Sequence, residues 1–158
     1  MRTENNLEGL GGWLILVGLS AITYPVFAFF SLYAYVPFLS APDQWDSLTN
    51  SSNEFFDAMS SAFIFVKLAV TALLFGIGTL LAWAFLSKKW FFPKMFIGLP
   101  LIAPVLALVD AKTINHFFPD EEVFSRRNIE EFLNYIIGIV VWVPYLLVSK
   151  RVAATFVK

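Results

Sequence analysis

Residues 59–86 read MSSAFIFVKLAVTALLFGIGTLLAWAFL, an apolar run in which Lys67 is the one charged residue. A run of about 18 or more apolar residues with few charges is long enough to cross the hydrocarbon core of a bilayer as a helix. Lipid offers the backbone no hydrogen-bond partner, so a spanning segment of this kind must be helical. We therefore predict a transmembrane helix over residues 61–86.

Three further apolar runs accompany this segment. Prolines occur inside all three of them, and membrane helices tolerate proline as a kink. The predicted spans are residues 12–36, 61–86, 91–110 and 130–148. Polar and charged side chains gather in residues 41–58 and 112–128, which are predicted as the two long loops. The predicted fold class is an all-α integral membrane protein, with a single four-helix bundle domain over residues 1–158.

The composition agrees with a membrane protein. Of the 158 residues, 58% are apolar and 15% are charged, whereas a soluble domain has about 45–50% apolar and about 25% charged residues. The net charge of −1 provides no basic field to attract nucleic acid. Because the chain has no cysteine, disulfides, thiolate metal sites and a cysteine nucleophile are excluded.

The first apolar run, from Gly9 to Ser40, is too long for a secretory signal peptide, whose apolar region has roughly 7–15 residues. Glu4 and Glu8 also make the preceding segment a poor signal start. We therefore expect an uncleaved span.

The distribution of cations predicts the orientation of the spans, because Lys and Arg beside membrane spans favour the cytoplasmic side. Seven cations would lie on one side and three on the other. The seven are Arg2, Lys88, Lys89, Lys94, Lys150, Arg151 and Lys158, and the three are Lys112, Arg126 and Arg127. Both termini are therefore predicted to be cytoplasmic, with the two long loops outside.

Two local patterns predict helix contacts and a helix start. Small residues four positions apart, as in Ala72-x-x-x-Gly76 and Gly78-x-x-x-Ala82, let helix backbones approach closely in lipid. They could pack within the chain or against a second copy. Asn128, followed three residues later by Glu131, is predicted to cap the start of the fourth span.

Lys67 and Asp110 need explanation, because a charge at the centre of a membrane helix costs about 2.5–3.5 kcal/mol on insertion scales. Helical rise places both residues towards the outer ends of consecutive, antiparallel spans. We hypothesise that they form an intramembrane ion pair, or at least share a polar pocket with Lys112 near the outer face. The alternative is that Lys67 extends its ammonium group to the outer headgroups while Asp110 ends its span.

Residue sets that would indicate catalysis or metal binding are missing from the sequence. Gly-x-Ser-x-Gly, His-Glu-x-x-His and phosphate-binding glycine loops do not occur. His116 is the one histidine, and a zinc site usually takes four ligands. We therefore predict no enzyme activity, catalytic residue, cofactor or metal, and regard His116 as an ordinary interfacial residue.

Both ends of the chain carry a recognisable pattern. Near the C-terminus stand Trp142, Pro144 and Tyr145, then Ser149, Arg151 and Val152, then Thr155 and Phe156. Near the N-terminus stands Leu10-Gly11-Gly12-Trp13-Leu14. Together with four spans, these elements resemble the bacterial inner-membrane proteins grouped as domain of unknown function 2569. The resemblance implies a multi-pass location in the inner membrane and supplies no activity, ligand or catalytic residue.

Arg151 and Thr155 share one face of a helix that continues past Ser149, because they are four residues apart. We hypothesise that this face docks on the short inner loop or on another protein.

Two functional hypotheses follow from these patterns. The first is a non-catalytic accessory or interaction protein that binds a membrane-protein partner. The second is a subunit of an oligomeric transporter or channel for small solutes or ions, supported by Lys67, Asp110 and the proline-broken third span. The lipid bilayer is a partner in both, and self-association of the chain is compatible with both.

Overall fold

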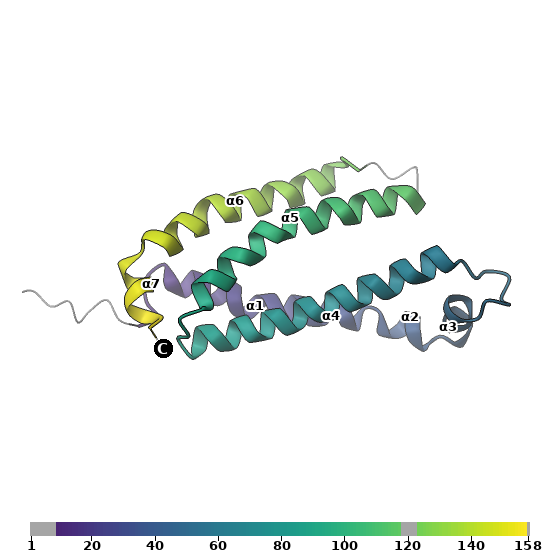
Figure 1. Ribbon diagram of the computed structural model, residues 1–158, viewed down its shortest axis with the longest axis horizontal. Helices are drawn as coiled ribbons and strands as arrows, with labels where there is room; N and C mark the ends of the chain where they lie inside the picture. Colours follow the sequence, from purple (N-terminus) through teal and green to yellow (C-terminus); the bar gives the residue numbers. More distant parts are fainter. Residues whose placement is uncertain (1–8, 118–122, 158) are drawn as a thin grey trace, which may run out of the picture. The chain divides into compact units, whose positions relative to one another are not determined.

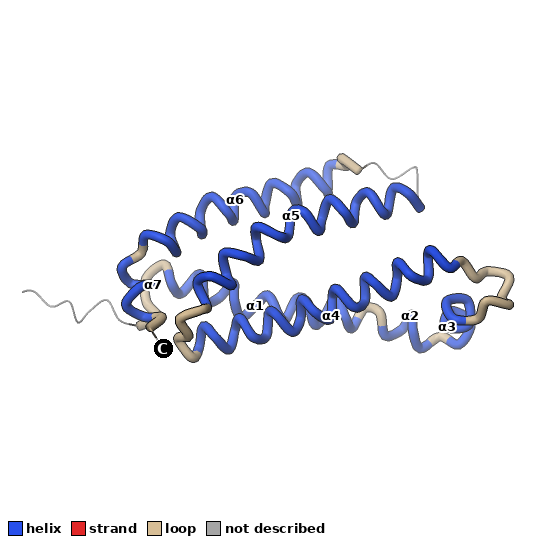
Figure 2. Tube along the Cα trace, in the orientation of Figure 1, coloured by secondary structure: helices blue, strands red, loops and turns tan. Residues whose placement is uncertain are grey.

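The computed structural model describes residues 9–117 and 123–157, and their regular structure is entirely helical (Figures 1 and 2). The helices are α1 (Leu14–Tyr33), α2 (Val36–Ser40), α3 (Pro42–Thr49), α4 (Ala58–Leu86), α5 (Phe92–Phe117), α6 (Arg126–Val148) and α7 (Lys150–Thr155). The all-helical fold class predicted from sequence is therefore confirmed.

Four segments are long and apolar enough to cross a membrane. They are Leu14–Ser40, Ala58–Leu86, Phe92–His116 and Asn128–Val148. The shortest has 21 residues, which at 1.5 Å per residue gives about 31 Å, enough for a hydrocarbon core about 30 Å thick. The chain is therefore a multi-pass membrane protein by the length and composition of its helices, as the sequence predicts.

The first long connection contains a helix that the sequence analysis did not predict. Ala41 is extended, as a residue before proline usually is, and Pro42 then occupies the first turn of α3. Trp45 of α3 packs edge-on against Phe65 of α4 at 6.2 Å between ring centroids, and Leu48 is buried. Packing against α4 therefore orders part of residues 41–58, in spite of their polar composition.

Helix α4 starts on an aspartate cap. The Oδ2 atom of Asp57 accepts a hydrogen bond from the backbone N–H of Ser60 at 2.7 Å. Hydrogen bonds from the Ser60 side chain, then from its backbone, hold the pKa of Asp57 below its usual range. The lowered pKa means that the cap is present at neutral pH and is lost only when the pH falls through that pKa.

The turn from α4 into α5 is closed by backbone hydrogen bonds. Lys88 has a φ of 52°, and its N–H donates to the carbonyl of Phe85 at 3.0 Å. The N–H of Lys89 reaches back to the carbonyl of Ala84 at 2.9 Å. These two bonds form a Schellman motif, which satisfies the carbonyls at the end of α4 and makes a tight reversal.

Helices α5 and α6 lie side by side (Figure 1). Their facing ends differ from the prediction, because α5 continues through Phe117 instead of ending at Asp110 and α6 starts at Arg126. The predicted capping role of Asn128 is wrong. The cap is Ser125, whose hydroxyl accepts from the N–H of Asn128 at 3.3 Å, while the Asn128 side chain donates to the carbonyl of Val123. Part of the predicted loop 112–128, residues 118–122, lies outside the described residues.

The chain divides into two compact units. Unit 1 consists of the described parts of Met1–Gly18 and Ala84–Lys158, and unit 2 is Leu19–Trp83. Helices α1 and α4 each contribute residues to both units. The single domain over residues 1–158 stays a prediction.

Close approach of α1 and α4 holds unit 2 together. A Cβ atom added to Gly78 would lie 2.6 Å from the Tyr24 ring and 3.3 Å from the Pro25 Cα atom, so only glycine fits this contact. Phe29 and Phe75 extend the same interface, with 6.2 Å between ring centroids. By contrast, a Cβ added to Gly76 meets nothing within 4 Å. The glycine of Gly78-x-x-x-Ala82 therefore makes a contact within the chain.

These two glycines allow a matched test of the packing. Gly78→Ala should destabilise the protein relative to Gly76→Ala by about 1–3 kcal/mol, because the added methyl group forces Tyr24 or the α1 backbone away from α4. Both substitutions change the helix propensity of α4 equally, so the difference isolates the contact. Unfolding free energies in detergent micelles measure it, and equal values for the two variants would contradict the packing described.

Candidate functional site

The C-terminal segment bends at Ser149 and returns to unit 1 as a short helix. The backbone of Ser149 leaves the helical region, with φ −72° and ψ 112°, and its N–H donates to the carbonyl of Tyr145 at the end of α6. Its hydroxyl then accepts from the N–H of Val152 at 3.4 Å and caps the start of α7. Ser149 is therefore the corner that turns α7 away from α6.

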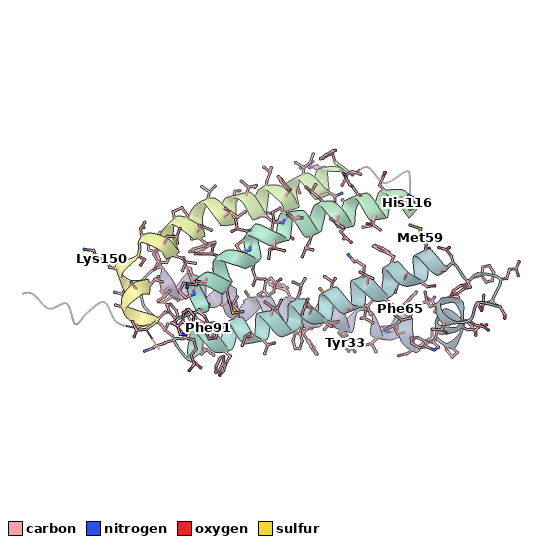
Figure 3. All side chains as sticks on the ribbon, viewed as in Figure 1. Tyr33, Met59, Phe65, Phe91, His116 and Lys150 are labelled. Atoms are coloured by element: carbon pink, nitrogen blue, oxygen red, sulfur yellow. The ribbon has the colours of Figure 1, made fainter. Side chains whose placement is uncertain are left out.

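One face of α7 is buried in unit 1. Val152, Thr155 and the following Phe156 are each less than 7% exposed. Lys150 lies on the opposite face and is exposed (Figure 3). This distribution makes α7 an amphipathic helix whose apolar face packs inward.

Thr155 joins the two ends of the chain. The backbone N–H of Gly9 donates to Thr155 Oγ1 at 3.2 Å, and the Thr155 hydroxyl lies 3.4 Å from the carbonyl oxygen of Gly9, to which it can donate. Gly9 has a φ of 109°, a conformation that side chains on Cβ strongly disfavour. A glycine at this position and a hydroxyl at Thr155 therefore form a specific tether between residues 146 positions apart.

Arg151 lies against the same N-terminal segment. A Cβ atom added to Gly11 would come within 2.5 Å of the Arg151 Nη1 atom, so the absence of a side chain leaves room for the guanidinium group. Arg151 and Thr155 thus both face residues 9–11, as their spacing on one helical face predicts.

A cluster of aromatic rings lies beneath these contacts. The Phe156 ring stacks on Phe92 with 4.7 Å between centroids and lies 5.9 Å from Phe85. Phe92 is fully buried, and Phe85 is 3% exposed. Gly18 of α1 lets the Phe85 ring approach the backbone of that helix, since a Cβ there would overlap the ring. We call this contacting set the terminal clamp: Gly9, Gly11, Gly18, Phe85, Phe92, Arg151, Thr155 and Phe156.

Aromatic and cationic side chains surround the terminal clamp. Trp13 is 62% exposed and meets Trp142 edge-on at 6.4 Å, and Trp142 in turn meets Tyr145. At the connection between α4 and α5, Lys94 places its ammonium group 5.0 Å from the centre of the exposed Trp90 ring. Phe91, beside Trp90, marks this connection in Figure 3. Indole rings with cations are typical of the headgroup layer of a membrane.

The structure brings most of the C-terminal motif together with the N-terminal one. Arg151, Thr155 and Phe156 belong to the terminal clamp, Ser149 forms its corner, and Trp142 with Tyr145 borders it. Pro144 lies within α6 and is exposed. The sequence suggested docking on the short inner loop or on another protein. Thr155 bonds to Gly9, Arg151 lies against Gly11, and Phe156 packs on Phe92 beside that loop. Docking of this face on the loop or on another protein stays a prediction.

Lys67 and Asp110 lie in different compact units. Lys67 belongs to α4 in unit 2 and Asp110 to α5 in unit 1. Their pairing stays a prediction. Asp110 does not end its helix, since α5 continues to Phe117.

Asp110 lines a pocket whose lining includes neither Lys67 nor Lys112, so it differs from the shared polar pocket suggested by the sequence. The pocket has a volume of about 290 Å³ and lies between the second half of α5 and the first turns of α6. Small residues of α5, Ala107 and Ala111, help to form its wall. Alanines four residues apart were visible in the sequence, but they indicate close helix packing as readily as a cavity.

Metal ligands do not gather within residues 9–117 and 123–157. No group of three or more His, Asp or Glu side chains is close enough there to hold an ion. His116 lies in the last turn of α5 and is exposed (Figure 3).

Comparison with protein families identifies the family of the chain. The family described as "Protein of unknown function (DUF2569)" matches residues 7–157, which include both ends of the terminal clamp. No curated protein and no solved structure matches the chain. The resemblance drawn from the two terminal motifs is thereby confirmed.

The tether at Thr155 provides a test of the terminal clamp. Thr155→Val should lower the unfolding free energy by about 1–3 kcal/mol, because it leaves the partly buried Gly9 N–H without its acceptor. Thr79→Val is the matched control, since the exposed Thr79 hydroxyl donates within its own helix, to the carbonyl of Phe75. The control should change stability by less than about 0.5 kcal/mol. Equal losses for both variants, measured by denaturation in micelles, would show that the tether adds nothing.

Proposed function

The chain belongs to the DUF2569 family, a family of unknown function, and we propose that it is a non-catalytic accessory protein of the bacterial inner membrane. In this role it binds another membrane protein and stabilises or modulates it. Both termini and the terminal clamp lie on the cytoplasmic side.

The observation that carries the proposal is that the side chains of the two terminal motifs have structural roles. Their side chains serve as structural parts: Thr155 as a tether, Ser149 as a helix cap and Phe156 as a stacked core ring. These contacts fix the position of α7 beside the N-terminal segment. They give unit 1 a defined end, bordered by exposed indole and cationic groups, that a partner can recognise.

The charges around the terminal clamp support the cytoplasmic orientation. Lys88, Lys89 and Lys94 flank the connection next to Phe92, and Lys150 and Arg151 belong to the helix before Phe156. Stacking of Phe92 on Phe156 therefore brings both cationic segments to one end of unit 1. Cations concentrated at one end of membrane spans favour the cytoplasmic face.

The surfaces of the spans support a protein that works inside the bilayer. In the most apolar 18-residue stretch of each span, only between 6% and 22% is buried by the chain itself. Helix α6 is the extreme case, with Ile137, Val140 and Leu147 each more than half exposed. These surfaces require lipid or another membrane protein to cover them.

A second candidate function has its own supporting observation. Helix α5 runs unbroken through Pro100 and Pro104, so the expected proline break is not present. Ionisable residues within membrane spans often mark solute or ion pathways, and Asp110 lies inside α5 and lines a pocket. This arrangement favours a subunit of an oligomeric transporter or channel for small solutes or ions.

Native mass spectrometry of the protein, extracted gently from its own membrane, separates the two candidates. The accessory function predicts a stoichiometric complex with a second protein, which Trp90→Ala weakens because it removes an exposed ring beside the terminal clamp. Phe55→Ala is the control: it removes a ring that is 81% exposed in the α3–α4 connection and should leave the complex intact. A discrete homo-oligomer without a second protein would contradict the proposal and favour the transporter subunit.

A further inference from the structure

The pocket between α5 and α6 has walls of two kinds. Most of its lining is apolar and includes Ile114 of α5 with Ile129 and Phe132 of α6. Two polar side chains join them, Asp110 from α5 and Asn128 from α6. All of these residues belong to unit 1.

Its volume sets the size of a ligand. A cavity of about 150 Å³ accommodates benzene, and this pocket, at about 290 Å³, is close to the lower limit of about 300 Å³ for small-molecule sites. It therefore has room for on the order of a dozen non-hydrogen atoms, the size of a short alkyl chain with one polar group.

The polar side chains set the chemistry of that group. The Nδ2 atom of Asn128 donates to the carbonyl of Val123 at 3.0 Å, which holds the amide and leaves its Oδ1 as an acceptor. A carboxylate provides about four acceptor positions, so Asp110 can accept from a ligand in addition to a partner within the chain. Asn128 keeps a second N–H donor beside its Oδ1 acceptor, whereas an ionised Asp110 offers acceptors alone. A hydrogen-bond donor on the ligand is therefore the group that matches both side chains.

We propose that the pocket binds lipophilic amines, with the alkyl chain between α5 and α6 and the ammonium group beside Asp110 and Asn128. Hydrogen bonds between ionised partners are about twice as strong as neutral ones, and surrounding apolar walls strengthen them further. An acid of the same length would bring a second negative charge to Asp110, and an alcohol would lack the positive charge. The order of binding is therefore amine, then alcohol, then acid.

Photolabelling of the full-length protein in lipid nanodiscs tests this order. The probes are diazirine-bearing decylamine, decanol and decanoate, and labelled peptides are mapped by mass spectrometry. The amine should label residues 107–133 most strongly, and unlabelled decylamine should compete. Asp110→Asn should reduce the amine labelling about tenfold, the scale of one lost charge-assisted hydrogen bond, and should reduce decanol labelling less, because the amide oxygen still accepts from a hydroxyl.

Two further variants separate a pocket from a general affinity for the spans. Ala111→Phe places a ring in the cavity and should abolish labelling by all three probes there. Val105→Phe is the control, because Val105 is 59% exposed on the same helix and does not line the pocket; labelling should persist in it.

The opposite results would overturn the proposal. Labelling of residues 107–133 that survives Ala111→Phe would mean that the probes bind the lipid-facing surface. Equal labelling by the amine and decanoate, unaffected by Asp110→Asn, would mean that the pocket does not select amines. Circular dichroism of each variant confirms that it is folded before labelling is compared.

Discussion

A backbone N–H or C=O group within hydrocarbon finds no water, so the chain itself must satisfy it. This constraint makes all four membrane-length segments helical. At the helix ends, N–H and C=O groups lack partners within the helix and need other hydrogen bonds. Polar side chains occur at those ends with a defined task. Asp57 caps α4, Ser125 caps α6 and Ser149 caps α7, while the turn at Lys88 satisfies the end of α4 by backbone bonds alone.

In the terminal clamp, too, a few polar groups act among mostly apolar contacts. It combines one hydroxyl, glycines that let Arg151 and the Phe85 ring approach the backbone, and a stack of phenylalanines. Stacked rings are stabilising in any apolar surrounding, whereas the Thr155–Gly9 bonds define which segments meet. The apolar contacts therefore supply most of the attraction, and the few polar contacts supply the specificity that positions α7.

The spans were predictable because apolar runs of membrane length have few alternative structures, and the composition of residues 59–86 alone is sufficient to predict one. Other features depend on contacts distant in sequence. Helix α3 is ordered by packing of Trp45 on Phe65, whereas the polar composition of this segment predicts a loop. The cap at Ser125 competes with a cap at Asn128 that looks equally good in sequence. The Thr155–Gly9 tether joins residues 146 positions apart, and the pocket at Asp110 depends on the spacing of two helices. Neither can be read from a local pattern.

Accessibility of introduced cysteines tests the central claim that the α4–α5 connection and the clamped C-terminal end lie on the same side of the membrane. Two spans, α5 and α6, separate these two parts of the chain, so the chain returns to the side from which α5 starts. The protein has no cysteine, so Ser51→Cys, Lys89→Cys and Val157→Cys each introduce a single thiol. A membrane-impermeant maleimide applied to intact cells that express the protein should label Ser51→Cys. It should label Lys89→Cys and Val157→Cys only after the cells are permeabilised. Labelling of Val157→Cys together with Ser51→Cys in intact cells would contradict the account, because the two positions would then share one side of the membrane.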